Sequence, residues 1–221
     1  MLKKFISFLL PWSLRRKLLI SWFGYEIHPT AKIGWAWVFP QKLVMKERSK
    51  IGHLTVGVHL DYIELGMNAS IGRSNWITGF PGSANSKHFA HQIGQREPKL
   101  IVGDHSAVTK QHHLDCTNSI VIGRFVTIAG YQSQFLTHSI DIYHNRQDSS
   151  PISIGDYCFI GTNVTVLGGS KLPAYSVLGA KSLLNKAYDD EWGLYAGVPT
   201  KFVKHLDKTY KYFTREEGFV F

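Results

Sequence analysis

Residues 152–184 read ISIGDYCFIGTNVTVLGGSKLPAYSVLGAKSLL, and an aliphatic residue recurs in them every six positions. These aliphatic positions are Ile154, Ile160, Val166, Leu172, Leu178 and Leu184. A period of six fits neither an α-helix nor a two-faced strand, whose side-chain periods are about 3.6 and 2. The spacing indicates short flat strands joined by corners, with the aliphatic side chains pointing inward.

Small residues and glycines mark the corners of this repeat. Gly155, Gly161 and Gly179 directly follow aliphatic positions, and glycine tolerates the backbone angles of tight turns. Four positions after the first five aliphatic residues stand mostly small side chains, namely Cys158, Val164, Ser170, Ser176 and Ser182. Three such strands form one triangular coil of about 18 residues, and coils stack at the strand spacing of about 4.8 Å.

The same pattern, an aliphatic residue followed by glycine, occurs upstream, although less regularly. It is found at Ile122-Gly123, Val102-Gly103, Ile71-Gly72, Leu65-Gly66 and Ile33-Gly34. The repeats before residue 100 are ragged, and the stretch GFPGSANSKHFAHQ at residues 79–92 reads as an insertion. The repeat therefore extends over most of the chain.

Repeats of this kind are the hexapeptide signature, and over about residues 27–206 the chain resembles the hexapeptide-repeat acyltransferases. It looks most like sugar O-acetyltransferases of the galactoside, maltose and capsule or colanic-acid types. LLPWSLRRKLLISWFGYEI at residues 9–27 resembles the polysaccharide-modifying branch. The resemblance implies an all-β fold, a left-handed parallel β-helix, with a short N-terminal helical segment and a C-terminal helix.

The resemblance also implies partners and a division of the chain. Acetyl-CoA is expected as the acyl-donor substrate, a saccharide as the acceptor and a homotrimer as the assembly, with no permanently bound cofactor. We expect an amphipathic helical segment at 1–26, the catalytic β-helix at 27–186 with a loop at 139–151, and a C-terminal extension with a helix at 187–221.

Composition narrows the class of protein. The chain has 221 residues with 44% hydrophobic residues, which predicts a globular core. The formal net charge of +9 favours an acidic partner such as a phosphate or an anionic lipid. No dense basic run or aromatic-basic interleaving is present, so nucleic acid is not expected. The two cysteines, Cys116 and Cys158, do not look like a disulfide framework and indicate a reducing cytoplasm.

Residues 1–24 begin like a secretory signal but depart from one. The apolar run ends at Pro11 after about eight residues, Arg15-Arg16-Lys17 follow, and no small-residue cleavage site is present. The run is also too short to span a bilayer. We expect two short amphipathic helices that either pack on the protein or a neighbouring subunit, or contact anionic membrane at the inner face.

His138 is the candidate catalytic base. It stands in FLTHSID at residues 135–141, and the resemblance places a catalytic histidine directly after a threonine and before a polar excursion. A neutral imidazole would take the proton of a sugar hydroxyl as it attacks the thioester, then protonate the CoA thiolate, with no acyl-enzyme. The alternative is a satisfied histidine at the surface or at a subunit interface. His144 is the rival within the excursion.

Further side chains are candidates for the support of this base. Asp141 and Asp115 are the carboxylates that would hold its other nitrogen, although both are equally typical of turns. Some relatives use an asparagine one coil earlier as oxyanion donor, and the residue that aligns with it is Thr109. His113 either lines the acceptor pocket or stacks at an interface.

The resemblance also assigns the donor site, along a groove between C-terminal coils of adjacent subunits. Thr162, Ala180 and Lys186 match CoA-contacting positions, and Lys201 and Lys204 in YAGVPTKFVKHLD are candidates for the CoA phosphates. The alternative is that both lysines are solvated side chains on a terminal helix. The chain lacks a P-loop or dinucleotide glycine motif, which argues against a nucleotide-transferring enzyme.

Three other functions stay open from the sequence. A zinc enzyme of the carbonic anhydrase type needs three convergent imidazoles, and neither His88/His91 nor His112/His113 is placed like the ligands of that type, so we expect no metal site. A non-catalytic β-helix scaffold is the second alternative. An N-acetyltransferase acting on an amino sugar is the third, because the same base serves an amine.

The repeat is interrupted around His138. After Ile122 and Ile128 the next six-residue position holds Gln134, and the aliphatic spacing resumes only at Ile154, 20 residues later. This gap predicts that the chain leaves the stack at His138, and that residues 139–151 shape the acceptor pocket.

Overall fold

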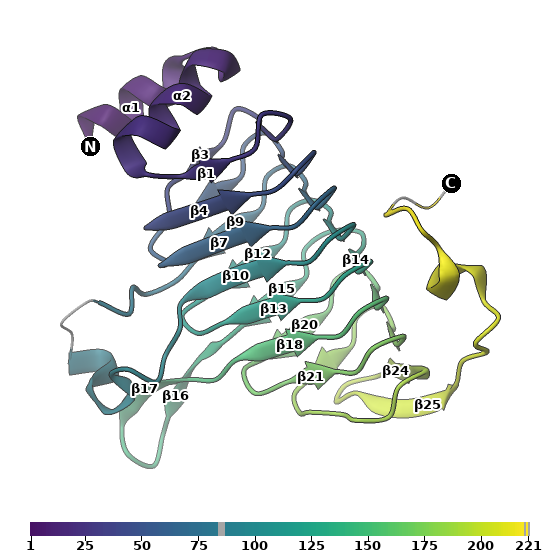
Figure 1. Ribbon diagram of the computed structural model, residues 1–221. Helices are drawn as coiled ribbons and strands as arrows, with labels where there is room; N and C mark the ends of the chain where they lie inside the picture. The colour runs from purple at the N-terminus through teal and green to yellow at the C-terminus, as the bar shows by residue number, and fades with distance from the viewer. Residues whose placement is uncertain (84–86, 219, 221) are drawn as a thin grey trace.

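The computed structural model describes residues 1–83, 87–218 and 220, and these residues form a left-handed parallel β-helix of stacked triangular coils (Figure 1). The all-β prediction is confirmed. Two helices, α1 (Leu2–Leu9) and α2 (Trp12–Phe23), lie at one end of the stack. Arg15 fixes α2 to the first coil by donating to the carbonyls of Gly34 at 3.0 Å and Ala36 at 2.5 Å. Burial lowers the pKa of Arg15 to about 10.

Three parallel sheets form the faces of the described β-helix, and successive strands along the chain pass from one sheet to the next. The first sheet contains β1 (Glu26–Ile27), β4 (Lys42–Met45), β7 (Tyr62–Leu65), β10 (Lys99–Val102), β13 (Ile120–Ile122), β18 (Ile152–Ile154) and β21 (Lys171–Leu172). The second contains β2 (Lys32–Ile33), β5 (Lys50–Ile51), β8 (Ser70–Ile71), β11 (Ala107–Val108), β14 (Thr127–Ile128), β19 (Phe159–Ile160), β22 (Val177–Leu178) and β24 (Gly193–Ala196), and it ends with the antiparallel β25 (Lys201–His205). The third contains β3 (Trp37–Val38), β6 (Val56–Gly57), β9 (Trp76–Thr78), β12 (His113–Asp115), β15 (Gln134–Leu136), β20 (Thr165–Leu167) and β23 (Leu183–Leu184).

The predicted aliphatic repeat forms the core. Ile154 pairs in register with Leu172, and Ile160 with Leu178, so residues one coil apart stack directly on each other. All six aliphatic residues of the 152–184 stretch are buried. Their burial stabilises the fold by roughly 1.5–3 kcal/mol for each side chain.

The inward position that follows Ile128 is taken by Phe135, one residue after Gln134, where the six-residue spacing is interrupted. Phe135 is fully buried and pairs in register with Leu114 and Val166, whereas Gln134 points outward and is exposed. The corner between Ile128 and Phe135 contains one residue more than the corners of the neighbouring coils at 108–114 and 160–166, and it turns through positive φ at Gly130 and Gln132.

The predicted loop at 139–151 is an antiparallel hairpin. Its strands are β16 (His138–Asp141) and β17 (Arg146–Ser149), which form a sheet of their own beside the stack. It leaves from the corner between the third and the first sheet, and 32 residues separate Ile122 from Ile154 where 18 separate Ile154 from Leu172. A second segment outside the repeat, residues 79–98, leaves from the same corner two coils earlier, and its described part contains the 3-10 helix η1 (Lys87–Gln92).

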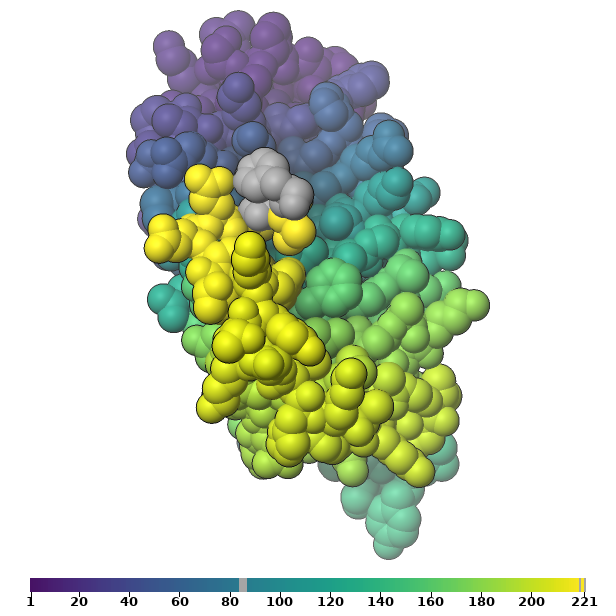
Figure 2. Space-filling view, turned by 90° about the vertical axis from the view of Figure 1, so that its right-hand side faces the viewer, coloured from purple at the N-terminus to yellow at the C-terminus, as the bar shows by residue number. Residues whose placement is uncertain are grey.

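The C-terminal segment lies along the corner between the first and the second sheet, as Figure 2 shows. Its helix is a single 3-10 turn, η2 (Lys211–Thr214). The corner beneath carries a column of stacked rings, with centroids 4.4 to 5.2 Å apart, formed by His105, Phe125, Tyr157, Tyr175 and Trp192. Arg215 donates to the Phe125 carbonyl and lies 3.9 Å from the ring centroid of Tyr212. None of the helices among the described residues is long and apolar enough to cross a bilayer.

We predict that Phe135 and Gln134 differ sharply in their contribution to stability. Phe135→Ala removes a fully buried ring and should lower the free energy of unfolding by about 3–5 kcal/mol. Gln134→Ala removes an exposed side chain and should change it by less than about 0.5 kcal/mol. Urea denaturation of both variants measures the difference, and equal effects would contradict this register.

Candidate functional site

Thr137, directly before His138, anchors this point of the chain to the stack. Its side chain is buried, and its hydroxyl donates to the Asp115 carbonyl at 2.7 Å and accepts from the Asn118 amide at 2.9 Å. These bonds tie the end of β15 to the coil before it. His138 is therefore the first residue of the hairpin and is anchored by the rigid stack.

The imidazole of His138 lies between an amide and a carboxylate. Its Nε2 is hydrogen-bonded to Gln147 Oε1, and its Nδ1 lies 3.8 Å from Asp115 Oδ2. The Phe89 ring packs against it with the ring centroids 5.6 Å apart. Its side chain is 37% exposed, so a substrate can reach it.

Asp115 is the carboxylate that the fold brings to His138. It lies on the outer face of β12, and its Oδ1 accepts hydrogen bonds from the amide of Thr117 at 2.9 Å and from its hydroxyl at 2.7 Å. The side chain is only 16% exposed. Thr117 thus orients the carboxylate and leaves Oδ2 toward the imidazole.

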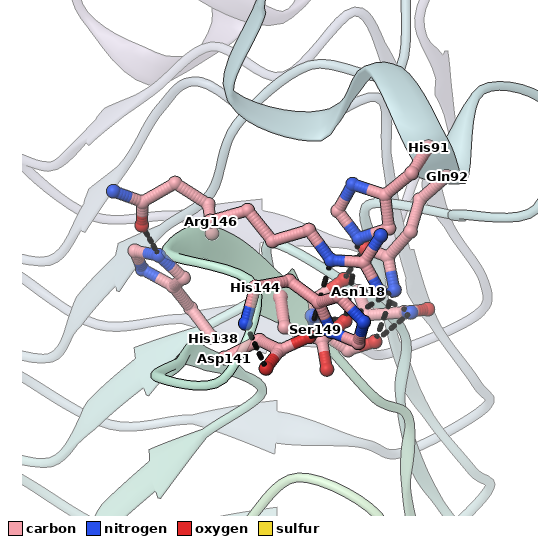
Figure 3. Close-up of polar contacts among 10 residues, drawn as sticks. His91, Gln92, Asn118, His138, Asp141, His144, Arg146 and Ser149 are labelled. Atoms are coloured by element: carbon pink, nitrogen blue, oxygen red, sulfur yellow. Dashed lines mark hydrogen bonds and ion pairs between the residues drawn. The ribbon is translucent and has the colours of Figure 1, made fainter.

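Asp141 has other partners. It lies three residues after His138 in the hairpin, on the opposite face, because successive strand side chains alternate. Its carboxylate accepts from His144 Nδ1 at 2.6 Å and from Arg146 Nε at 3.1 Å (Figure 3). The hydrogen bonds from His144, followed by that from Arg146, lower the pKa of Asp141 to about 2. Asp141 and His144 therefore form a network in the hairpin, directed away from His138.

The irregular segment 79–98 holds the base of this hairpin. Gln92 donates to Asp148 Oδ1 at 2.8 Å and to the Ser149 carbonyl at 2.9 Å, and Ser149 Oγ donates back to Gln92 Oε1 at 2.8 Å. Asn118 also contacts Ser149, at 3.3 Å (Figure 3). The sequence signalled an insertion here but not that it packs on the hairpin.

Arg96 fixes the ring that touches His138. Its guanidinium lies 4.4 Å from the Phe89 centroid and donates to the Thr117 carbonyl at 2.8 Å. Burial lowers the pKa of Arg96. Sequence reasoning missed Phe89, Arg96 and Gln147, because all three belong to segments outside the repeat.

The neighbouring histidines 112 and 113 have different environments. His112 is buried at the corner between the second and third sheets, where Nδ1 accepts from the Ser133 amide at 3.1 Å and Nε2 lies 2.9 Å from Thr109 Oγ1. Desolvation lowers the pKa of His112 to about 4. Thr109 also contacts the Gly130 carbonyl at 2.8 Å, so it stabilises this corner and is not directed at His138.

His113 lines a polar groove on the outer face of the third sheet. The groove has a volume of about 550 Å³, and the neighbours of His113 in register are Trp76 and Gln134. Trp76 is 53% exposed. His113 and Asp115 lie on the same face of β12, two residues or about 7 Å apart, so Asp115 lies just beyond the end of the groove that His113 lines.

Two of the predicted CoA contacts lie on one edge. Thr162 and Ala180 stand one coil apart at the corner between the second and the third sheet. The two coils approach each other closely there, because a Cβ on Gly161 would lie only 2.6 Å from the Ala180 amide nitrogen. Lys201 extends this edge, because it pairs with Ala196 at the start of β25.

The other two predicted CoA contacts lie elsewhere. Lys204 is exposed further along β25, so neither it nor Lys201 is helical. Lys186 lies at the opposite end of β23 from Ala180, on the edge that carries His138, with its ammonium 5.0 Å from the Tyr188 ring centroid. Within the described part of the chain, no three His, Cys, Asp or Glu side chains are grouped to hold a metal ion.

Some known proteins resemble this chain in sequence or in fold. No protein-family model matches the chain. A probable acetyltransferase of Mycobacterium tuberculosis is 24% identical over 146 residues, which are 66% of this chain and 45% of that protein. The chain therefore spans less than half the length of this relative.

Solved structures share the architecture at low sequence identity. A hexapeptide-repeat-containing acetyltransferase of Vibrio cholerae, complexed with acetyl coenzyme A, has a TM-score of 0.50 at 19% identity, covering 93% of this chain and 84% of its own. An N-acyltransferase of Bacillus cereus, in complex with dTDP and coenzyme A, has a TM-score of 0.50 at 11% identity, covering 83% of this chain and 86% of its own. The predicted resemblance to hexapeptide-repeat acyltransferases is confirmed at the level of the fold.

We predict a pH-dependent loss of stability that arises from His112. The unfolded chain binds this proton at the ordinary pKa of 6.5, whereas the folded chain binds it only at about 4. The unfolded state therefore holds more protons between these values, and lowering the pH through this window should destabilise the fold by up to ~3 kcal/mol. Urea denaturation across the window measures the slope.

The variant His112→Gln should flatten this dependence, because it removes the titrating ring. His28 is exposed, and His28→Gln serves as the matched control that keeps the wild-type slope. A wild-type slope in His112→Gln as well would contradict the assignment.

Proposed function

We propose that the protein is an acetyl-CoA-dependent O-acyltransferase that acts on a saccharide hydroxyl with His138 as general base. The supporting observation is the environment of His138, whose two ring nitrogens face the oxygens of Gln147 and Asp115 on a surface open to substrate. The fold adds support, since a structural neighbour of the same architecture was crystallised with acetyl coenzyme A.

The proposal gives each ring nitrogen of His138 a role. With Nε2–H donated to Gln147, the lone pair of the neutral ring is on Nδ1, and this atom takes the hydroxyl proton. The oxygen attacks the thioester carbon, the carbon–sulfur bond breaks, and the departing CoA thiolate takes the proton back from Nδ1. Asp115 stabilises the imidazolium formed between these events, because its carboxylate is 3.8 Å from Nδ1 and held by Thr117.

A saccharide acceptor fits the groove beside this base. Trp76 offers an exposed aromatic face, and His113 and Gln134 offer polar groups in register with it. Aromatic faces pack on the apolar C–H surface of a sugar ring, while imidazole and amide groups bind its hydroxyls. A ring in this groove lies about 7 Å along the strand from Asp115, within reach of His138.

The donor is proposed to lie along the edge formed by Thr162, Ala180 and Lys201, with its phosphates extending toward Lys204, three residues further along β25. His138 and Trp76 are both well exposed in one chain, so a second chain is needed to enclose two substrates. This openness supports the proposed homotrimer. Cys116 and Cys158 are buried and unpaired, which supports a reducing cytoplasm.

We predict that His138→Ala lowers the rate of acetyl-dependent CoA-thiol release by about 10²–10⁴-fold, the usual contribution of a general base. Thiol release is measured with acetyl-CoA and a panel of sugars, nucleotide sugars and lipid-linked saccharides. Calorimetry should show unchanged acetyl-CoA binding, because the base contacts only the reacting atoms.

The matched control is His144→Ala, which removes a histidine of the same hairpin that binds Asp141 and should leave the rate nearly unchanged. A wild-type rate in His138→Ala would support the scaffold alternative. Release with amino sugars alone would favour N-acylation, and no release with any saccharide would exclude the acceptor class.

We predict that Trp76→Ala raises the KM for the acceptor by about tenfold, because the aromatic contact contributes about 1–1.5 kcal/mol. The kcat and the KM for acetyl-CoA should stay near their wild-type values. Trp35→Ala is the control, since Trp35 is 57% exposed and lies beside α1, near the end of the stack opposite the hairpin. Equal effects of both variants would contradict the proposed acceptor groove.

A further inference from the structure

The N-terminal end of the molecule presents an apolar helix face to solvent. Leu2, Phe5, Ile6 and Leu9 share one face of α1, because they are three or four residues apart, and they are 74, 56, 40 and 61% exposed. The side turned toward the protein includes Ser7, which is fully buried. A surface helix normally has the reverse arrangement, with its apolar stripe inward.

Positive charge flanks this face without any acidic side chain. Residues 1–25 contain no Asp or Glu. Two of the cations are occupied, since Arg15 binds carbonyls of the first coil and Arg16 donates to the Ile27 carbonyl at 2.6 Å. Lys3 and Lys17 are exposed, and the Lys3 ammonium lies 5.9 Å from the Trp22 ring centroid. The end of the molecule is therefore apolar at its centre and basic around it.

A pocket beside the two helices repeats this combination. It has a volume of about 690 Å³ and is lined by Leu10, Trp12 and Trp35 together with Lys32 and Lys50. The two lysines pair in register between β2 and β5. Within the residues that the structure describes, neither ammonium group has a hydrogen-bond or ion-pair partner. Like charges in this position repel, and a bound anion would relieve the repulsion.

We propose that this end of the protein binds the surface of a bilayer that contains anionic phospholipid. The apolar side chains of α1 insert among the headgroups, and Lys3 and Lys17 lie among the lipid phosphates. The lysine pair at 32 and 50 receives one headgroup phosphate, with the two tryptophans against its apolar part. This inference concerns a surface apart from the proposed active site and does not depend on the acyl-transfer reaction.

A second copy of the chain is a poorer occupant for this face. A stable protein interface buries roughly 800 Å² on each partner. The eight residues of α1 form a helix only about 12 Å long, with four exposed apolar side chains. Such a face is small for a protein interface, but short amphipathic helices of this kind bind lipid surfaces.

Sedimentation of the full chain with vesicles tests the proposal. We expect binding to vesicles of phosphatidylcholine mixed with phosphatidylglycerol, weaker binding to phosphatidylcholine alone, and loss of the difference at high salt. Leu9→Glu should weaken binding to both by at least about tenfold, because it removes an inserted side chain. Lys32→Gln combined with Lys50→Gln should weaken binding to the anionic vesicles by about fivefold for each lysine.

Matched variants at other places control for changes in charge and surface. Ile93→Glu alters an aliphatic side chain that is 73% exposed in the segment 79–98, and it should bind vesicles like the wild type. Lys110→Gln with Lys181→Gln removes two exposed lysines of other coils and should also have no effect. Phe5→Ser is a second variant of the helix face, and melting temperatures confirm that each variant is folded.

Two results would overturn the proposal. One is unchanged vesicle binding by both Leu9→Glu and Phe5→Ser. The other is a lower oligomeric mass of Leu9→Glu in light scattering without lipid, which would show that a second copy of the chain covers this face.

Discussion

Each coil of this protein is stable because its inward side chains stack on those of the coils above and below. A single triangular turn has one inward aliphatic residue on each of its three sides, with small buried residues at the corners, and no core of its own. Ile160 therefore depends on Ile128 before it and Leu178 after it. This requirement fixes the spacing of inward residues, the length of the strands and the small residues at the corners. Side chains with a chemical role can therefore stand only on the outward faces and at the corners.

The candidate site follows from this restriction. The segment 79–98 and the hairpin of β16 and β17 both leave the stack at the corner between the third and the first sheet, and one uninterrupted coil lies between them. That intervening coil contributes Asp115 and Thr117, while the two excursions contribute Phe89 and Gln147. Three segments thus surround His138, although none of them could enclose it alone.

The sequence predicted the stacked coils and the departure at His138, because both are visible in the aliphatic spacing. It did not show that Phe135 continues the inward column after Ile128, because the extra corner residue before Phe135 shifts the six-residue spacing by one. Asp115 and Asp141 could not be distinguished, because Asp141 lies in an unforeseen hairpin, on the face opposite His138, whereas Asp115 belongs to the stack. Gln147 and Phe89 could not be predicted, because the repeat does not determine how a segment that leaves the stack folds back onto it.

The stack also sets the distance between the helices at its N-terminal end and His138. Four coil steps of about 4.8 Å separate β3, beneath the helices, from β15, which ends beside His138, so His138 lies about 19 Å along the axis from the first coil. The rigidity of parallel stacking means that this height changes only in whole coils. If the protein docks by its helices, His138 would thus reach groups held well above the lipid headgroups, and inserting or removing one coil would change this height by about 4.8 Å.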